Sequence, residues 1–101
     1  MFVTAFDGVA WLRTQPETRT LWVGGTIDRQ TGLELIPALV VALNEDVSWQ
    51  VLNLEELTGL SAGGDRLIQS LCRLAAAHET PLRVVYPRRD VTVDDGDRVI
   101  A

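Results

Sequence analysis

Apolar residues follow two alternating periods along this chain. Runs of branched and aromatic residues at 9–14, 20–24, 49–54 and 82–86 are typical of strands, and residues 2–6 suit a short edge strand. Two longer stretches, about 32–43 and 67–78, repeat apolar residues every three or four positions, as amphipathic helices do. From residue 20 onward the order is therefore strand, helix, strand, helix, strand.

This order predicts the architecture. Alternating strands and helices imply right-handed crossovers and parallel pairing at the centre of a sheet. The runs at 9–14 and 20–24 are separated by a turn containing Pro16, which predicts an antiparallel N-terminal hairpin. We expect one mixed α/β domain over residues 1–101, with a core at 9–86 and the helices mainly on one face of the sheet.

The sequence pattern leaves the structure of two regions undecided. Thr31 and Glu34 form a Thr-x-x-Glu capping box, so the first helix should begin near Gly32. Pro37 then predicts a kink or a later start, because its ring clashes with the carbonyl four residues earlier. Residues 87–101 contain two short apolar runs around an Asp-rich turn, which predicts an extra hairpin, with an acidic tail as the alternative.

Composition narrows the function classes. The net charge of −5, and basic residues that are all arginine, argue against nucleic acid and anionic membrane surfaces as partners. No apolar stretch is long enough to span a bilayer, and the N-terminus lacks the pattern of a signal peptide. The single cysteine, Cys72, cannot form an internal disulfide. These features predict a reduced, cytoplasmic domain.

Candidate chemistry is sparse. His78 has no histidine or cysteine near it in sequence and is placed to interact with a helix C-terminus. Cys72 lies on the apolar side of its helix, which suits a core thiol. The acidic turn at 94–97 comes too close to Ala101 for a calcium loop of the EF-hand type. We therefore expect no catalytic residues, no metal site and no cofactor.

The most informative segment is 51–64. It is interpreted as a buried strand, a short loop and a helix entry rich in small residues, at a place where recognition residues concentrate. The helix entry, with its free N–H groups and glycine pair, is expected to form an exposed tip that meets a partner. Asp28, which follows the earlier strand run at 20–24, is expected to lie near the same surface. The predicted binding residues are therefore Asp28, Asn53, Thr58, Ser61, Ala62, Gly63 and Gly64.

Two blocks of the sequence resemble the STAS family, the sulfate-transporter and anti-sigma-factor-antagonist domains. Val23-Gly24-Gly25-Thr26-Ile27-Asp28 followed by Thr31 is similar to the family's Gly-Glu-Leu-Asp block and helix start. Val51-Leu52-Asn53-Leu54 with Leu57-Thr58 resembles the second block, which normally runs into Asp-Ser-Ser-Gly-Leu. The resemblance covers about residues 9 to 86 and implies a phosphorylation switch that docks a partner.

The second block departs from the family's pattern at the switch. Aligned on the family's motif, Ser61 stands at the aspartate, Ala62 at the first serine and Gly63 at the serine that a partner kinase phosphorylates; Gly64 matches the glycine. The usual acceptor hydroxyl is absent, which implies a constitutive docking module. Thr58 and Ser61 are alternative acceptors, and Ser61 equally suits a helix cap.

The resemblance implies a non-enzymatic regulator of transcription. Its partner would be an anti-sigma factor of the serine-kinase type. An alternative is an accessory subunit of a lipid-transport ABC system, which would dock to the transporter ATPase at the cytoplasmic face of the membrane. A third alternative, a small α/β enzyme, lacks a catalytic constellation. Free strand edges near both termini also make a homodimer conceivable.

Overall fold

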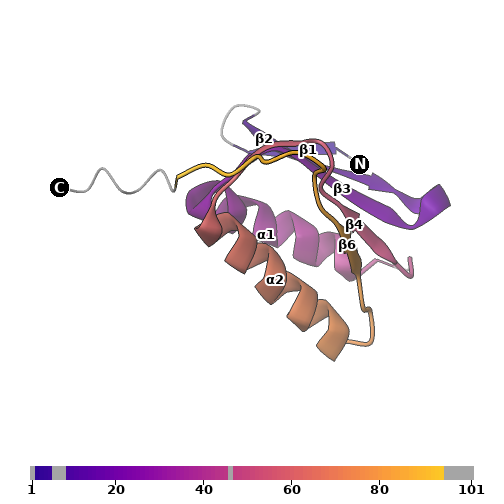
Figure 1. The fold of residues 1–101 in the computed structure, drawn as a ribbon. Helices are drawn as coiled ribbons and strands as arrows, with labels where there is room; N and C mark the ends of the chain where they lie inside the picture. Colours follow the sequence, from indigo (N-terminus) through magenta and orange to yellow (C-terminus); the bar gives the residue numbers. More distant parts are fainter. Residues whose placement is uncertain (1, 6–8, 46, 95–101) are drawn as a thin grey trace.

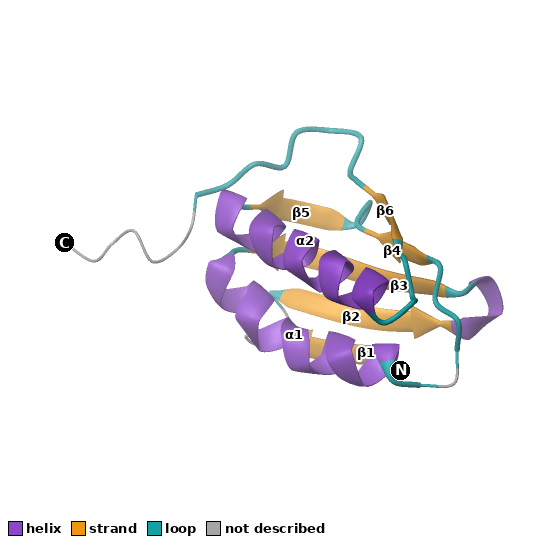
Figure 2. Ribbon diagram, turned by 90° about the horizontal axis from the view of Figure 1, so that it is seen from below, coloured by secondary structure: helices purple, strands orange, loops and turns teal. Residues whose placement is uncertain are grey.

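The computed structural model describes residues 2–5, 9–45 and 47–94 (Figure 1). These residues form the predicted mixed α/β domain, with six strands and two α-helices. Both helices pack on the same face of the sheet, and no helix of the described part covers the opposite face (Figures 1 and 2). Neither described helix offers an uncharged apolar span of the length that a bilayer requires.

The sheet is antiparallel at one side and parallel at the other. The order β1-β2-β3-β4-β6 joins β1 (Phe2–Ala5), β2 (Ala10–Gln15), β3 (Thr20–Ile27), β4 (Val51–Asn53) and β6 (Arg83–Val85). The antiparallel pairs β1–β2 and β2–β3 confirm the predicted N-terminal strands and hairpin. A 3-10 turn, η1 (Pro16–Thr18), connects β2 to β3.

The central strand β3 is long enough to pair with two strands along the same edge. Its first half pairs in parallel with β4, and its second half pairs in parallel with β5 (Leu57–Leu60). The segment 55–60, interpreted from the sequence as a loop, therefore contains a strand. Gly25 is the first residue of β3 that pairs with β5; its φ is 82°, and the register of this pairing shifts between Gly25 and Thr26, as at a β-bulge.

Helix α1 (Arg29–Leu43) begins earlier than the sequence indicated. The capping box is Asp28 with Thr31, not Thr31 with Glu34, so the predicted start near Gly32 is wrong. Asp28 continues β3 in an extended conformation, which places its carboxylate over the free N–H groups of the first turn. The helix then runs through Pro37 to its end, so the later start expected from this proline is also wrong.

Helix α2 (Ala62–Ala77) matches the predicted amphipathic stretch, with Ser61 as its N-cap and His78 as its C-cap. Its end is a Schellman motif, because Thr80 N–H donates to Ala75 and Glu79 N–H donates to Ala76. Glu79 adopts the left-handed conformation that glycine usually takes in this motif, with φ of 61°.

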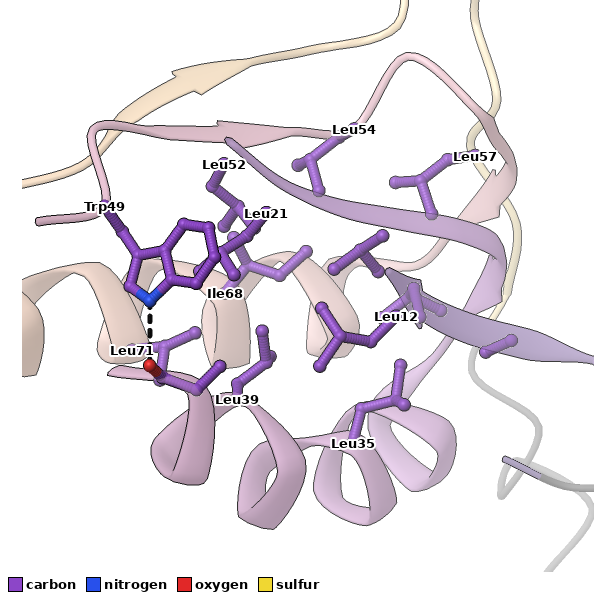
Figure 3. Close-up of a cluster of buried hydrophobic side chains, with 14 residues drawn as sticks. Leu12, Leu21, Leu35, Leu39, Trp49, Leu52, Leu54, Leu57, Ile68 and Leu71 are labelled. Atoms are coloured by element: carbon purple, nitrogen blue, oxygen red, sulfur yellow. Dashed lines mark hydrogen bonds between the residues drawn. The ribbon is translucent and has the colours of Figure 1, made fainter. Parts of the chain in front are cut away.

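The core lies between the sheet and the two helices, where leucines from both layers interlock (Figure 3). Trp49 precedes β4 and is 2% exposed, and its indole N–H donates to the Ala42 carbonyl at 2.8 Å (Figure 3). This bond joins the last turn of α1 to the start of β4. It satisfies the only polar atom of a large buried ring.

The segment after β6 continues along the sheet. Val91 and Val93 exchange backbone hydrogen bonds with Leu60, and Thr92 forms a parallel bridge with Leu60. The described part of the predicted C-terminal hairpin thus pairs with β5. The second arm of that hairpin, 98–100, and the acidic turn from residue 95 onward lie outside the described residues.

Candidate interaction site

Most of the predicted binding residues meet at the carboxyl end of β3. There Asp28 leads into α1, and Ser61 leads from β5 into α2 beside it; Ser61 N–H donates to the Ile27 carbonyl at 2.9 Å. Open parallel sheets commonly bind ligands and partners outside the carboxyl ends of their strands. The fold therefore places two helix starts and their capping side chains at one edge.

Asp28 is held by its own helix. Its carboxylate accepts from Thr31 N–H at 2.9 Å, and its own N–H donates to the Thr31 hydroxyl at 2.8 Å. The Thr31 hydroxyl also lies 3.1 Å from the Thr26 carbonyl. Asp28 is half-buried, so the residue is partly open to solvent at the site.

Ser61 is the N-cap of α2, the structural role that the sequence offered as the alternative to phosphorylation. Its hydroxyl accepts from Gly64 N–H at 2.9 Å, and the residue is 0% exposed. The cap is therefore confirmed. A kinase would reach this hydroxyl only if the entry of α2 opened, because the acceptor atom is both buried and bonded.

The glycine pair does not form an exposed tip. Gly63 and Gly64 are buried, and a Cβ at Gly64 would lie 2.5 Å from the Ile27 carbonyl oxygen. The glycine at 64 allows α2 to approach the end of β3 closely. The expectation that the pair itself presents free backbone to a partner is wrong, and the exposed residue of this entry is Ala62.

The two remaining predicted residues lie in different places. Thr58 is exposed on β5, and its hydroxyl is 3.3 Å from that of Thr26, so it borders the site. Asn53 pairs with Trp22, five residues before Ile27 along β3, and is 9% exposed. Its carboxamide accepts from Glu55 N–H at 2.8 Å, which makes it a turn residue away from the others.

The sheet face opposite the helices carries aromatic side chains that the sequence placed in strands. Arg13 lies 5.2 Å from the centre of the Trp22 ring, and the Trp22 indole donates to Gln15 at 2.8 Å. Trp11 covers Gly24, where a Cβ would lie 2.1 Å from the indole. These are the cross-strand contacts expected of tryptophans on neighbouring strands.

Within the described ranges, three titratable groups have shifted pKa values, and none of them is among the predicted binding residues. Burial raises the pKa of the half-buried Cys72 thiol. Burial, and then the hydrogen bond to Asp65, raise the pKa of Tyr86. Hydrogen bonds from Thr92 lower the pKa of Asp90. Among the described residues, no three His, Cys, Asp or Glu side chains gather as metal ligands would.

Sequence reasoning missed a second surface, between the C-terminal halves of α1 and α2. A groove of about 500 Å³ lies there, lined by Val40, Leu43, Asn44, Leu74, Ala75, His78 and Thr80. The signal was present in the sequence: residues 35–43 contain no polar side chain, more apolar surface than one buried helix face needs.

Fold and site together define a small mixed α/β domain whose two helices start side by side at one sheet edge. No protein-family model matches the chain, and neither a curated protein nor a solved structure matches it.

Proposed function

We propose that this domain is a non-enzymatic regulator that docks another protein, as anti-sigma-factor antagonists do, without the phosphorylation switch. The observation that carries the proposal is the entry of α2. It starts with a capping serine at the carboxyl end of the parallel strands, where the resemblance to STAS domains aligns the phosphorylated serine with Gly63.

The state of the hydroxyls at this entry supports a binder that is always active. Gly63 has no side chain to carry a phosphate, and the Ser61 hydroxyl is buried in its cap. The surface left to a partner comprises Asp28, Thr58 and Ala62, which are exposed or half-buried. A helix start with partial positive charge beside a carboxylate suits a partner that offers both a hydrogen-bond acceptor and a cation.

The partner we propose is a serine kinase of the anti-sigma type in the cytoplasm. The test is a pull-down with the purified domain, followed by incubation with candidate kinases and ATP and by mass spectrometry. Capture of the kinase without phosphate on Thr58 or Ser61 is the expected result. Capture should weaken in Thr58→Arg, which places a bulky cation on the exposed surface. Arg73→Ala, at an exposed position in the C-terminal half of α2, is the control.

A second variant tests the switch itself. Gly63→Ser restores the family's acceptor at a buried position, so phosphate transfer requires the entry of α2 to open on the bound kinase. We expect this variant to gain one phosphate from the captured kinase and then to release the kinase. Phosphate on wild-type Thr58 would replace the constitutive model with a relocated switch. Recovery of a transporter ATPase in place of a kinase would instead assign the domain to a lipid-transport ABC system.

A further inference from the structure

The two helices touch at their N-terminal halves and separate toward their C-terminal ends. Gly32 of α1 faces Leu67 of α2 so closely that a Cβ at position 32 would lie 2.8 Å from the leucine methyl. Further along, a groove of about 500 Å³ lies between the helices, which we call the C-terminal groove. Its walls are the last two turns of each helix.

The C-terminal groove exposes apolar side chains that a solvated surface does not need. Leu74, on the α2 wall, is 47% exposed. Val40 and Leu43, on the α1 wall, are half-buried, and Asn44, His78 and Thr80 add polar groups to the lining. Exposed apolar side chains bordered by polar residues in this way suit an interaction site. An amphipathic helix lying in such a groove is a recurrent way of covering it.

The charge around the groove selects the occupant. Both helix C-termini, with their partial negative charge, end here, and neither helix has a basic residue in its last turn. Glu45 and Glu79 follow the two helices and line an adjoining hollow that shares Leu43 and Thr80 with the groove. A cation at this end of the groove would be attracted by both carboxylates and both helix termini.

We infer that the C-terminal groove binds a cationic amphipathic helix of another protein. The chain's own C-terminal residues are a poor occupant, because Asp94, Asp95 and Asp97 would face the two glutamates. A second copy brings a net charge of −5 to an already acidic rim. The groove also lies at the other end of both helices from Asp28 and Ala62, so this site is independent of the proposed function.

The probe is a fluorescent helical peptide of about 14 residues, with leucines spaced i, i+4, i+7 and i+11 and with arginines elsewhere. Binding to the intact protein is measured by anisotropy, and a peptide of the same composition in scrambled order is the control. We expect a Kd between about 1 and 100 μM for the helical peptide, and binding at least tenfold weaker for the scrambled one.

Two matched pairs of variants locate the binding. Leu74→Gln should weaken it about tenfold, whereas Leu33→Gln, at a leucine that is 56% exposed but outside the groove, should leave it unchanged. The double variant Glu45→Gln/Glu79→Gln removes both carboxylates next to the groove and should weaken peptide binding and reduce its salt dependence. The double variant Glu17→Gln/Glu56→Gln removes the same charge elsewhere and should have a smaller effect on both.

Three results would overturn the inference. One is the absence of binding below about 1 mM by a domain that circular dichroism shows to be folded. Another is an equal effect from the two glutamate pairs, since attraction to the overall charge would then explain the binding. The third is a dimer in sedimentation equilibrium that Leu74→Gln dissociates, which would make a second copy the occupant.

Discussion

Gly64 shows how a single residue sets the distance between two layers of this domain. It lies in the first turn of α2, where the Ile27 carbonyl of β3 leaves no space for a side chain. The same carbonyl accepts the N–H of Ser61, so the end of β3 fixes both the cap and the first turn of α2. The packing of the helix entry therefore depends on the smallest residue at one position.

Replacing Gly64 with alanine should destabilise the domain. The added methyl group would lie 2.5 Å from the Ile27 oxygen and 2.9 Å from its carbon, so α2 or β3 must shift. Overpacking of this kind costs about 1–3 kcal/mol and outweighs the roughly 1 kcal/mol that alanine gains over glycine in a helix. We expect the free energy of unfolding, measured in urea, to fall by up to about 2 kcal/mol. Ala62→Ser, at the exposed start of the same helix, is the control and should change it little.

A Gly64→Ala variant as stable as the wild type would show that α2 approaches β3 less closely than described.

Of the predicted site residues, Ser61 illustrates what the sequence contains and what it lacks. A serine before a helix indicates a cap from local chemistry alone. The burial of Ser61 and Gly64 depends on the end of β3, which is more than thirty residues earlier in the chain, and no local pattern encodes that distance.

At the scale of elements, the order of strands and helices was predictable and some boundaries were not. Two overlapping capping boxes compete at the start of α1, and Asp28 prevails because β3 delivers it in an extended conformation. Strand β5 was missed because it is short and contains Gly59, a residue type that is uncommon in strands. It forms because the eight residues of β3 extend past β4 and offer free backbone groups to a second parallel partner.

Helix α1 contains a proline that its geometry does not require. Pro37 is exposed in the middle of the helix and has no N–H to donate to the Leu33 carbonyl. Pro37→Ala should therefore raise the free energy of unfolding, by about 1–3 kcal/mol, because proline costs about 3 kcal/mol in a helix interior. The urea midpoint should rise with an unchanged slope.

The control for this change is Pro16→Ala. Pro16 begins the 3-10 turn η1, where a fixed φ and a missing N–H cost nothing, so its replacement should leave stability unchanged or slightly lower. If Pro37→Ala proved less stable than the wild type, the shape that the proline gives α1 would be needed for its packing on the sheet.

At the scale of the whole molecule, the two ends of the helices present different surfaces. The N-terminal ends carry the capping side chains of Asp28 and Ser61 beside the carboxyl ends of β3 and β5. The C-terminal ends leave a groove of mixed apolar and polar lining, with Glu45 and Glu79 in the adjoining hollow. Parallel strands with helices on one face produce this arrangement, because each crossover returns its helix in the same direction. The two binding surfaces that we propose therefore lie at opposite ends of the helices.

The segment after β6 covers the free edge of β5. Leu60 N–H donates to the Val91 carbonyl at 2.7 Å, and Val93 N–H donates to the Leu60 carbonyl at 3.1 Å. The side chain of Val91 packs against the core. A chain ending at Pro87 would lose two hydrogen bonds of about 1 kcal/mol each and the burial of part of two valine side chains. Compared with a chain ending at Asp94, we expect its free energy of unfolding in urea to fall by about 2–4 kcal/mol.

The shorter chain should also associate, because an uncovered strand edge is a template for pairing with another copy. Sedimentation velocity over a range of concentrations would detect this as a rise in average mass that the chain ending at Asp94 does not show. Equal stability and equal mass for the two chains would mean that the bonds between Leu60 and 91–93 contribute nothing to the fold. The edge of β5 would then be open to a partner strand, beside the exposed Thr58 of the proposed docking surface.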